Sequence, residues 1–195
     1  MIINRNELKT ITGCDYYDGA VLHQRFAYKF FKKNVRAVGN IVAFEAPMEV
    51  TTNLIDLEDA INNDFIYSVR AINFLIEIPN IDLFAGVCFQ RLYNAQLGSL
   101  LCTKYLQKEG YVDGDDIMVK DGEEYKKASV SIATNVNGAV LIHVGININA
   151  GDKAPSFAYS THLTDEASNA FMVDAIQMFQ AMVNDIFCAT TKTIA

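Results

Sequence analysis

One stretch, AVLIHVGININ at residues 139–149, constrains the fold more than any other, because its side chains alternate with a period of two. The even-numbered positions from 140 to 148 are all valine or isoleucine. Such alternation is typical of a β-strand that shows different faces to its two sides. The chain must therefore build a sheet around this segment, with one apolar face. The other face carries Leu141, His143, Gly145, Asn147 and Asn149.

The preceding segment, KKASVSIAT, predicts the partner strand of a hairpin, and two registers are open. A two-residue turn at Asn-Gly 137–138 would place Ser131 opposite Val144. A three-residue loop, 136–138, with the glycine left-handed in a bulge, would place Ser131 opposite His143. We expect the second register, because a one-residue slip exchanges the faces and only this one makes each face uniform. It would gather one polar patch with a glycine floor: Lys127, Ser129, Ser131, His143 and Asn147.

The remaining pattern predicts an α+β fold with a mostly antiparallel sheet and packed helices, in a single domain spanning 1–195. Its strands follow one another instead of alternating strictly with helices. The expected elements are a helix at 19–33 with Asp18 as N-cap, strands at 39–50 and 66–78, an acidic loop with one helical turn at 51–64, a central helix at 82–108, and a final helix capped by Thr164 whose apolar stripe is core or a dimer face.

Charge and composition exclude several classes of partner. The net charge of −7, from 23 acidic and 16 basic residues, argues against nucleic acid and anionic membrane surfaces. No segment reaches the 18 or so apolar residues of a membrane span, and MIINRNELKT lacks the apolar region of a signal peptide. The four cysteines show no CxxC spacing. We expect reduced cysteines and a cytoplasmic location, with one disulfide as the minority interpretation.

Familiar catalytic motifs are missing: the sequence has no phosphate-binding GxxxxGK[ST], no GxGxxG, no GxSxG and no HExxH. The three histidines, His23, His143 and His162, are isolated from one another in the sequence. The strongest local signal is 113–149, where an acidic pair, a glycine turn and a lysine precede the alternating strand. A solvated sheet face and the floor of a ligand pocket both fit this pattern.

The motifs GDDIMV, KKASVSIAT and VLIHVGININ resemble the catalytic core of biotin and lipoate protein ligases. Those enzymes carry an N-D pair, a K-x-x-G strand and a G-x-G-I-N-x-N strand. With DYYDGAVLHQRFAYK and DLED added, nearly the whole chain is more closely similar to an uncharacterised family, domain of unknown function 366. The resemblance implies the fold of biotin/lipoate ligases and of class II aminoacyl-tRNA synthetase catalytic domains.

The resemblance also implies site residues. Lys127 stands at the position of the lysine that contacts the acyl-adenylate, and Asp116 at that of the ligase aspartate, with Asp115 in place of its asparagine. Asn147 and Asn149 match the two asparagines. Lys127 would stabilise a phosphate or carboxylate, and His143 would be a general acid or base. The expected ligand-binding set is Asp115, Asp116, Ser129, Ser131, Gly145, Asn147 and Asn149.

Two departures from the ligases weigh against biotinylation and lipoylation. The glycine of K-x-x-G is Val130, and segment 51–64 has neither the glycines nor the arginines that hold an adenylate phosphate. An acidic loop repels bare phosphate unless a divalent metal intervenes. We therefore expect an acidic rim, either solvated or holding Mg²⁺. Its candidate metal ligands are Asp56, Glu58, Asp59 and Asp116.

Three functions remain open at this point. The first is an enzyme for a small anionic, nucleotide- or acyl-type ligand, either an adenylate-forming ligase or an acyltransferase, with ATP and Mg²⁺ as candidate cofactors. The second is a non-catalytic ligand-binding module on the same fold. The third is a structural dimerisation partner, which would show a large apolar interface and form a homodimer.

Overall fold

A computed structural model of the chain describes residues 1–23, 26, 29, 38–62 and 64–192. In chain order the elements are α1 (Arg5–Thr12), the 3₁₀ turn η1 (Ala20–His23), β1 (Asn40–Val50), α3 (Leu57–Asn62), β2 (Ile66–Pro79), α4 (Leu83–Leu100), the π-helical turn η2 (Leu101–Leu106), β3 (Gly110–Asp113), β4 (Asp116–Asp121), β5 (Glu124–Lys127), β6 (Ser129–Val136), β7 (Ala139–Asn149) and α5 (Asp165–Thr190). The α+β prediction with an antiparallel sheet and packed helices is confirmed.

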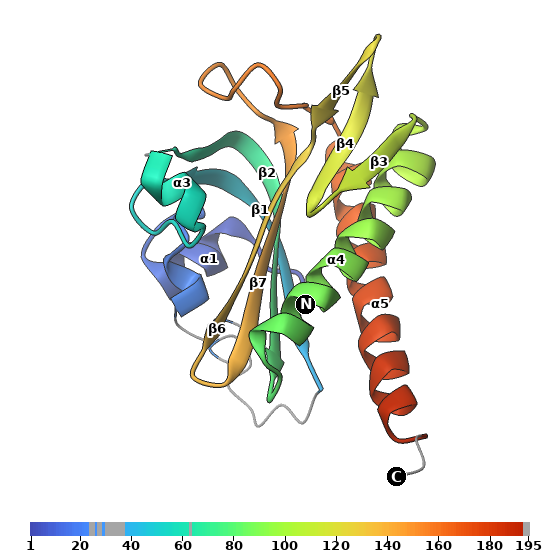
Figure 1. Cartoon of the computed structure of the whole chain (residues 1–195). Helices are drawn as coiled ribbons and strands as arrows, with labels where there is room; N and C mark the ends of the chain where they lie inside the picture. Colours follow the sequence, from blue (N-terminus) through green and yellow to red (C-terminus); the bar gives the residue numbers. More distant parts are fainter. Residues whose placement is uncertain (24–25, 27–28, 30–37, 63, 193–195) are drawn as a thin grey trace.

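The large sheet has the strand order β1-β2-β7-β6, with every neighbouring pair antiparallel. Helices α4 and α5 cover one of its faces, and α1 and α3 lie on the other side (Figure 1). Each face has its own apolar cluster, one containing Phe74, Phe171 and Phe179 and the other Phe44 and Met48. Central strand β7 is therefore buried on both sides.

The preferred register of the β6–β7 hairpin is wrong. Ser131 pairs with Val144 and Val136 with Ala139, so the connection is the two-residue turn at 137–138. Both turn residues have positive φ, 52° and 77°, which matches the right-handed twist of the strands. We expected one apolar and one solvated face on this hairpin, and that expectation failed because neither face is solvated. The polar side chains of β6 lie against α4 and β4, where groups of those elements form hydrogen bonds with them.

A second, smaller sheet of β3, β4 and β5 stands beside one end of the large one. Lys127 ends β5 instead of opening β6, and the chain changes sheets at Ala128. The Ala128 N–H donates to Ile117 O in the small sheet at 2.8 Å, and its carbonyl accepts from Asn147 N in the large sheet at 2.9 Å. Ala128 therefore links the two sheets through its backbone hydrogen bonds.

Local capping explains the helices. Asp82 accepts from Ala85 N at the start of α4, and Thr164 accepts from Ala167 N at the start of α5, as predicted for Thr164. Most of the apolar stripe of α5 is core. Asp18 accepts a hydrogen bond from Ala20 N at the start of η1. Beyond η1, most of the predicted 19–33 helix lies outside the described residues. No helix among the described residues combines the length and the apolarity needed to span a bilayer.

Candidate functional site

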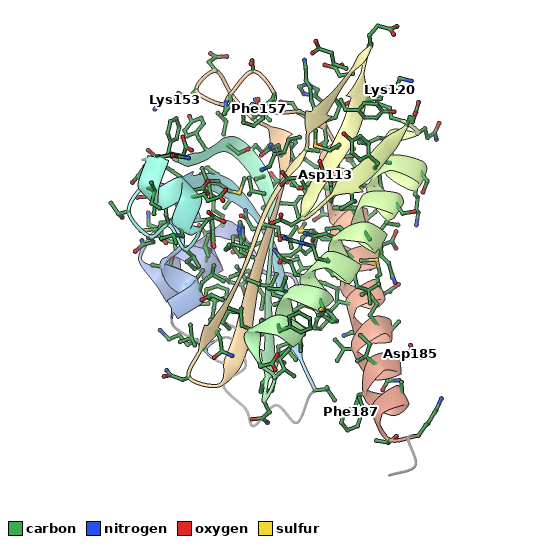
Figure 2. The ribbon with its side chains drawn as sticks, in the orientation of Figure 1. Asp113, Lys120, Lys153, Phe157, Asp185 and Phe187 are labelled. Carbon is green, nitrogen blue, oxygen red and sulfur yellow. The ribbon has the colours of Figure 1, made fainter. Side chains whose placement is uncertain are left out.

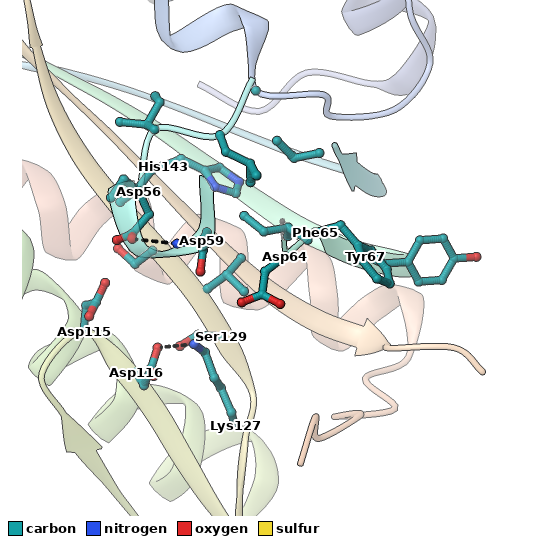
Figure 3. A pocket seen from close by; sticks show the side chains of 18 of the residues that line it. Asp56, Asp59, Asp64, Phe65, Tyr67, Asp115, Asp116, Lys127, Ser129 and His143 are labelled. Carbon is teal, nitrogen blue, oxygen red and sulfur yellow. Dashed lines mark hydrogen bonds and ion pairs between the residues drawn. The ribbon is translucent and has the colours of Figure 1, made fainter. Parts of the chain in front are cut away.

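A cavity of about 500 Å³ opens beside the edge strand β6, between α3 and the corner where the two sheets meet. We call it the edge cleft (Figure 3). Its size is in the range of small-molecule sites. Its walls come from segments far apart in the chain, including the N-terminal Tyr17 and the loop residue Phe157. Ten of the predicted site residues line it: Asp56, Glu58, Asp59, Asp115, Asp116, Lys127, Ser129, Ser131, His143 and Asn147.

Lys127 lies at the mouth of the corner and is held by its backbone. Its N–H donates to Phe157 O at 2.8 Å, and its carbonyl accepts from Tyr159 N at 2.7 Å. The side-chain amine pairs with Asp116 at 2.9 Å, and both groups are about 30% exposed (Figure 3). Burial raises the pKa of the Asp116 carboxyl, and the lysine opposes that shift. The predicted pairing of Lys127 with Asn147 is wrong, because its strand partner is Met118.

The two serines and Asp115 connect the sheets to α4. Ser129 Oγ accepts from Ile117 N at 2.8 Å, and Ser131 Oγ accepts from Gln90 at 2.7 Å. Asp115 pairs with Arg91 at 3.1 Å. These groups line the edge cleft, but their acceptor atoms already have partners within the protein. Their first role is to hold β6, β4 and α4 together.

His143 lies on the opposite side of the edge cleft and is only 1% exposed. Its Nε2 is 3.0 Å from Asn73 Oδ1, while the Asn73 amide nitrogen donates to two backbone carbonyls, those of residues 46 and 71. The Asn73 oxygen must therefore accept, so His143 Nε2 carries the proton and Nδ1 keeps its lone pair. Burial lowers the pKa of the ring to about 3, so it is neutral near pH 7.

Tyr17 holds the ring of His143 from the other side. The two rings are stacked 3.9 Å apart at 16°, and Tyr17 is itself bound to β1 by backbone hydrogen bonds to residues 47 and 49. Burial raises the pKa of the Tyr17 hydroxyl well above its ordinary value. No local pattern predicts this pair, because the contact depends on the N-terminal segment pairing in parallel with β1 at Met48.

Asn147 is the second buried polar residue of β7 in the edge cleft, 5% exposed. Its backbone N–H donates to Ala128 O, and its carbonyl accepts from both the N–H and the hydroxyl of Thr161. Its side-chain oxygen is buried and has no hydrogen-bond partner. A buried acceptor without a donor costs about 1–3 kcal/mol. A polar group of this kind requires an explanation, and a bound ligand supplies one.

Residues 56–62 and 64 form the acidic rim, and the expected single helical turn is α3. Asp56 Oδ1 caps that turn by accepting from the N–H groups of Glu58 and Asp59, at 2.8 and 3.2 Å. Burial, then the charges of Asp56 and Asp64, raise the pKa of Asp59. Within the described residues, no three acidic, histidine or cysteine side chains are placed to hold a metal ion. The predicted Mg²⁺ site stays a prediction without a preformed cluster.

Two predicted binding residues, Gly145 and Asn149, do not line the edge cleft. A Cβ added to Gly145 would lie 2.5 Å from Met48 Sδ, so the absent side chain makes room for Met48 and not for a ligand. Asn149 accepts from Gly151 N in the turn after β7. The alternation of β7 predicted both residues, but the register shift of β7 against β2 at Arg70 and Ala71, together with the packing of β1, decides their surroundings.

Several lining residues were not predicted from the sequence: Tyr17, Asp64, Phe65, Tyr67 and Phe157. Phe65 and Phe157 are half exposed, which is unusual for large apolar side chains (Figures 2 and 3). The exposed pair Leu57 and Ile61, on α3 beside the cleft, is also apolar. Aromatic and aliphatic groups at the rim of a polar cleft are typical of sites for ligands with an apolar body. Only the fold brings them together.

Comparison with known proteins agrees with this architecture. A family model described as Domain of unknown function (DUF366) matches residues 8–194. The chain belongs to this family. A solved protein of unknown function from Pyrococcus horikoshi has a similar structure. The likeness covers 92% of this chain and 93% of that protein's chain, with 23% sequence identity and a TM-score of 0.80. No curated protein matches by sequence.

More distant solved structures share the fold of this DUF366 protein. A Thermoplasma acidophilum protein, Ta0514, solved with bound lipoic acid, covers 80% of this chain and 78% of its own at 12% identity, with a TM-score of 0.51. A bi-partite lipoate protein ligase from Thermoplasma acidophilum covers 80% and 76% at 11% identity, with a TM-score of 0.50. The likeness to ligases expected from the motifs is therefore confirmed at the level of fold.

Proposed function

We propose that this DUF366 protein binds a small nucleotide- or acyl-type ligand in the edge cleft and acts on it as an adenylate-forming ligase or an acyltransferase. The observation that carries the proposal is Lys127, fixed by backbone hydrogen bonds at the junction of the sheets with its amine in the cleft. A positioned ammonium stabilises a carboxylate or phosphate where negative charge develops. Asp116 orients that ammonium from the other side.

His143 has a narrower role than general acid–base catalysis. A ring whose pKa is about 3 is a neutral imidazole near pH 7, so it has no imidazolium proton to give and is a weak base there. Its Nδ1 lone pair can still accept a hydrogen bond from a ligand. We therefore assign His143 to ligand positioning, with the ring orientation set by Asn73 and Tyr17.

ATP with Mg²⁺ remains the candidate cofactor pair, but the described residues do not fit a metal held by protein groups alone. The Asp56 side chain caps α3, and Asp116 is paired with Lys127. Mg²⁺ is often held by one or two carboxylates together with substrate phosphates, and the cleft offers only that arrangement. We propose no reaction step through the metal.

The alternative is a binding module that performs no chemistry. It is favoured by segment 51–64, which has no glycine and no arginine and presents Asp56, Glu58 and Asp59 where the ligases hold phosphate. Such a module would bind the ligand without turnover. Ligand-induced stabilisation measured together with product formation separates the two functions.

A thermal-shift screen tests the proposal with ATP and GTP, each with and without Mg²⁺, and with short- and medium-chain fatty acids. A ligand at 100 times its Kd adds about 2.7 kcal/mol to the unfolding free energy. Lys127→Gln should abolish the shift. Lys126→Gln is the matched control, because Lys126 pairs with Asp121 and does not line the cleft. No shift with any compound, or equal loss in both variants, would reject the proposal.

Two further expectations belong to this proposal. Cytoplasmic action fits the four cysteines, all free thiols in the structure. A homodimer would need an apolar surface, and a groove of about 760 Å³ lies where β2 ends, lined by residues of α4 and α5 that include Leu92 and Phe187. Phe187 lies near the end of α5 (Figure 2). Light scattering at two protein concentrations decides whether a second copy associates.

A further inference from the structure

The charges that line the edge cleft are strongly unbalanced. Among the lining residues that the structure describes, six are acidic, and Lys127 is the only lysine or arginine. Lys127 is neutralised by Asp116, and Asp115 by Arg91. The other four carboxylates form no ion pair with any described residue: Asp56, Glu58, Asp59 and Asp64. The rim therefore attracts positive charge.

Two polar side chains of β7 that line the cleft, His143 and Asn147, also carry acceptor atoms for which no donor is present among the described residues. The side-chain oxygen of Asn147 is buried and has no donor. His143 offers only the lone pair of Nδ1, because Nε2–H donates to Asn73. A ligand that satisfies these atoms must bring N–H or O–H donors. The uncharged acceptors thus point to the same chemistry as the carboxylates, and they come from a different element, β7.

A bare metal ion does not fit this arrangement. The described residues contain no group of three metal-ligating side chains close enough to share one ion. An organic ammonium is larger and has several donors pointing in different directions, so it can contact carboxylates that are too far apart to chelate. Phe65 and Phe157, both half exposed, offer aromatic surface to its apolar body and π-faces to its charge.

We propose that the ligand of the edge cleft carries a protonated amine, held by the carboxylates of Asp59 and Asp64 with Asn147 as a hydrogen-bond acceptor. In Figure 3 both carboxylates are directed into the cleft. The inference rests on the proposed function in one respect, that the ligand occupies this cleft. It adds the class of ligand: a primary amine with an aromatic or other apolar body.

Three phenols of nearly equal shape test the charge preference by calorimetric titration: tyramine, 4-ethylphenol and 3-(4-hydroxyphenyl)propionate. They carry a cation, no charge and an anion on the same ring. We expect tyramine to bind about tenfold or more tightly than 4-ethylphenol, the anion to bind more weakly than either, and tyramine affinity to fall with added salt. Equal affinities, no binding by tyramine, or preference for the anion would overturn the inference.

Variants locate the binding. Asp59→Asn and Asp64→Asn should each weaken tyramine binding about fivefold or more, whereas Glu123→Gln, an acidic residue in the exposed β4–β5 turn, should not. Asn147→Leu should weaken binding without lowering the unfolding free energy, because it removes a buried acceptor that has no partner. A structural role for Asn147 would lower stability and leave affinity intact, which contradicts the inference.

The outcome also separates this inference from the proposed function. If Mg-ATP or a fatty acid stabilises the protein through Lys127 while tyramine fails to bind, the amine inference is wrong and the proposed function stands. If tyramine binds with the expected dependence on Asp59 and no nucleotide or acyl compound binds, the amine inference stands and the proposed function is wrong.

Discussion

The two faces of strand β7 belong to very different surroundings. On one, Val140, Val144 and Ile146 pack against α4 and α5 in a cluster rich in aromatic rings, including Phe74 and Phe171. On the other, the strand buries two polar side chains, His143 and Asn147, next to the edge cleft. Both faces exclude water almost completely, so burial alone does not distinguish them.

The difference lies in what satisfies each face. The helix-covered face is stabilised by close packing alone, because apolar side chains contribute stability in proportion to the area they bury. The cleft face needs specific partners. His143 has Asn73 and Tyr17, whereas the Asn147 oxygen has none. The first face therefore carries stability, and the second loses some stability because it buries a polar atom that has no partner.

The largest expected effect on stability comes from adding a methyl group to a glycine, and each face has one glycine at which this change can be made. A Cβ on Gly86 of α4 would lie 2.4 Å from a methyl of Val140, a β-branched residue that cannot move aside. Overpacking of this kind costs about 1–3 kcal/mol or more, and the better helix propensity of alanine returns at most about 1. We expect Gly86→Ala to lower the unfolding free energy in urea by about 2–3 kcal/mol.

Gly145→Ala is the matched change on the cleft face. Its Cβ would meet Met48 Sδ at 2.5 Å, but methionine is unbranched and can turn away. We expect a loss of about 1 kcal/mol. Val140→Ala should rescue part of the Gly86→Ala loss in a double-mutant cycle. Equal losses of unfolding free energy at the two glycines, or no energetic coupling between positions 86 and 140, would show that the two faces tolerate an added methyl group equally.

The next effect concerns pH and His143. The folded pKa of about 3 lies below the ordinary 6.5, so the unfolded chain binds a proton that the folded chain refuses between those values. This contribution to stability is complete above pH 6.5 and is lost as the pH falls toward 3. Between pH 7.5 and 5 the wild-type protein should lose about 2 kcal/mol more than His143→Gln. Parallel urea curves for the two proteins would contradict the buried neutral imidazole.

The smallest effect comes from the acidic rim. Burial and the neighbouring carboxylates raise the pKa of Asp59, so its charge opposes folding, and that cost grows as the pH rises through the folded pKa. Asp59→Asn should therefore raise the unfolding free energy at pH 7.5 by about a few tenths of a kcal/mol, and by less at pH 3. Glu123→Gln provides the baseline. A loss of stability on removing the Asp59 charge would mean that this carboxylate stabilises the fold.

Much of the molecule could be predicted from local patterns. The period-two alternation of 139–149 is a strand, and Thr164 caps the last helix. These features depend on residues next to each other in the chain, where backbone preference and capping act. The motif resemblance led to the right fold, and ten of the twelve predicted site residues line the edge cleft.

Register was the point at which local reasoning failed. The expectation assumed one apolar and one solvated face, so polar residues of β6 were set against polar residues of β7. In the structure Ser129 faces Ile117 and Ser131 faces Gln90, and Val130 and Ile132 share the other side with His143. Partners from other elements satisfy the serines. Polarity on a doubly buried strand therefore does not identify its solvent side.

The sequence by itself determined the main strands, the last helix and the acidity of segment 51–64, because these follow from composition and short-range periodicity. The tertiary structure alone decided what each polar group is for. Packing of Tyr17 and Asn73 turned a lone histidine into a neutral acceptor, Met48 filled the space at Gly145, and the sheet change at Ala128 brought Lys127 beside the acidic rim. Chemistry at a site depends on distances between residues remote in the chain, and only folding sets those distances.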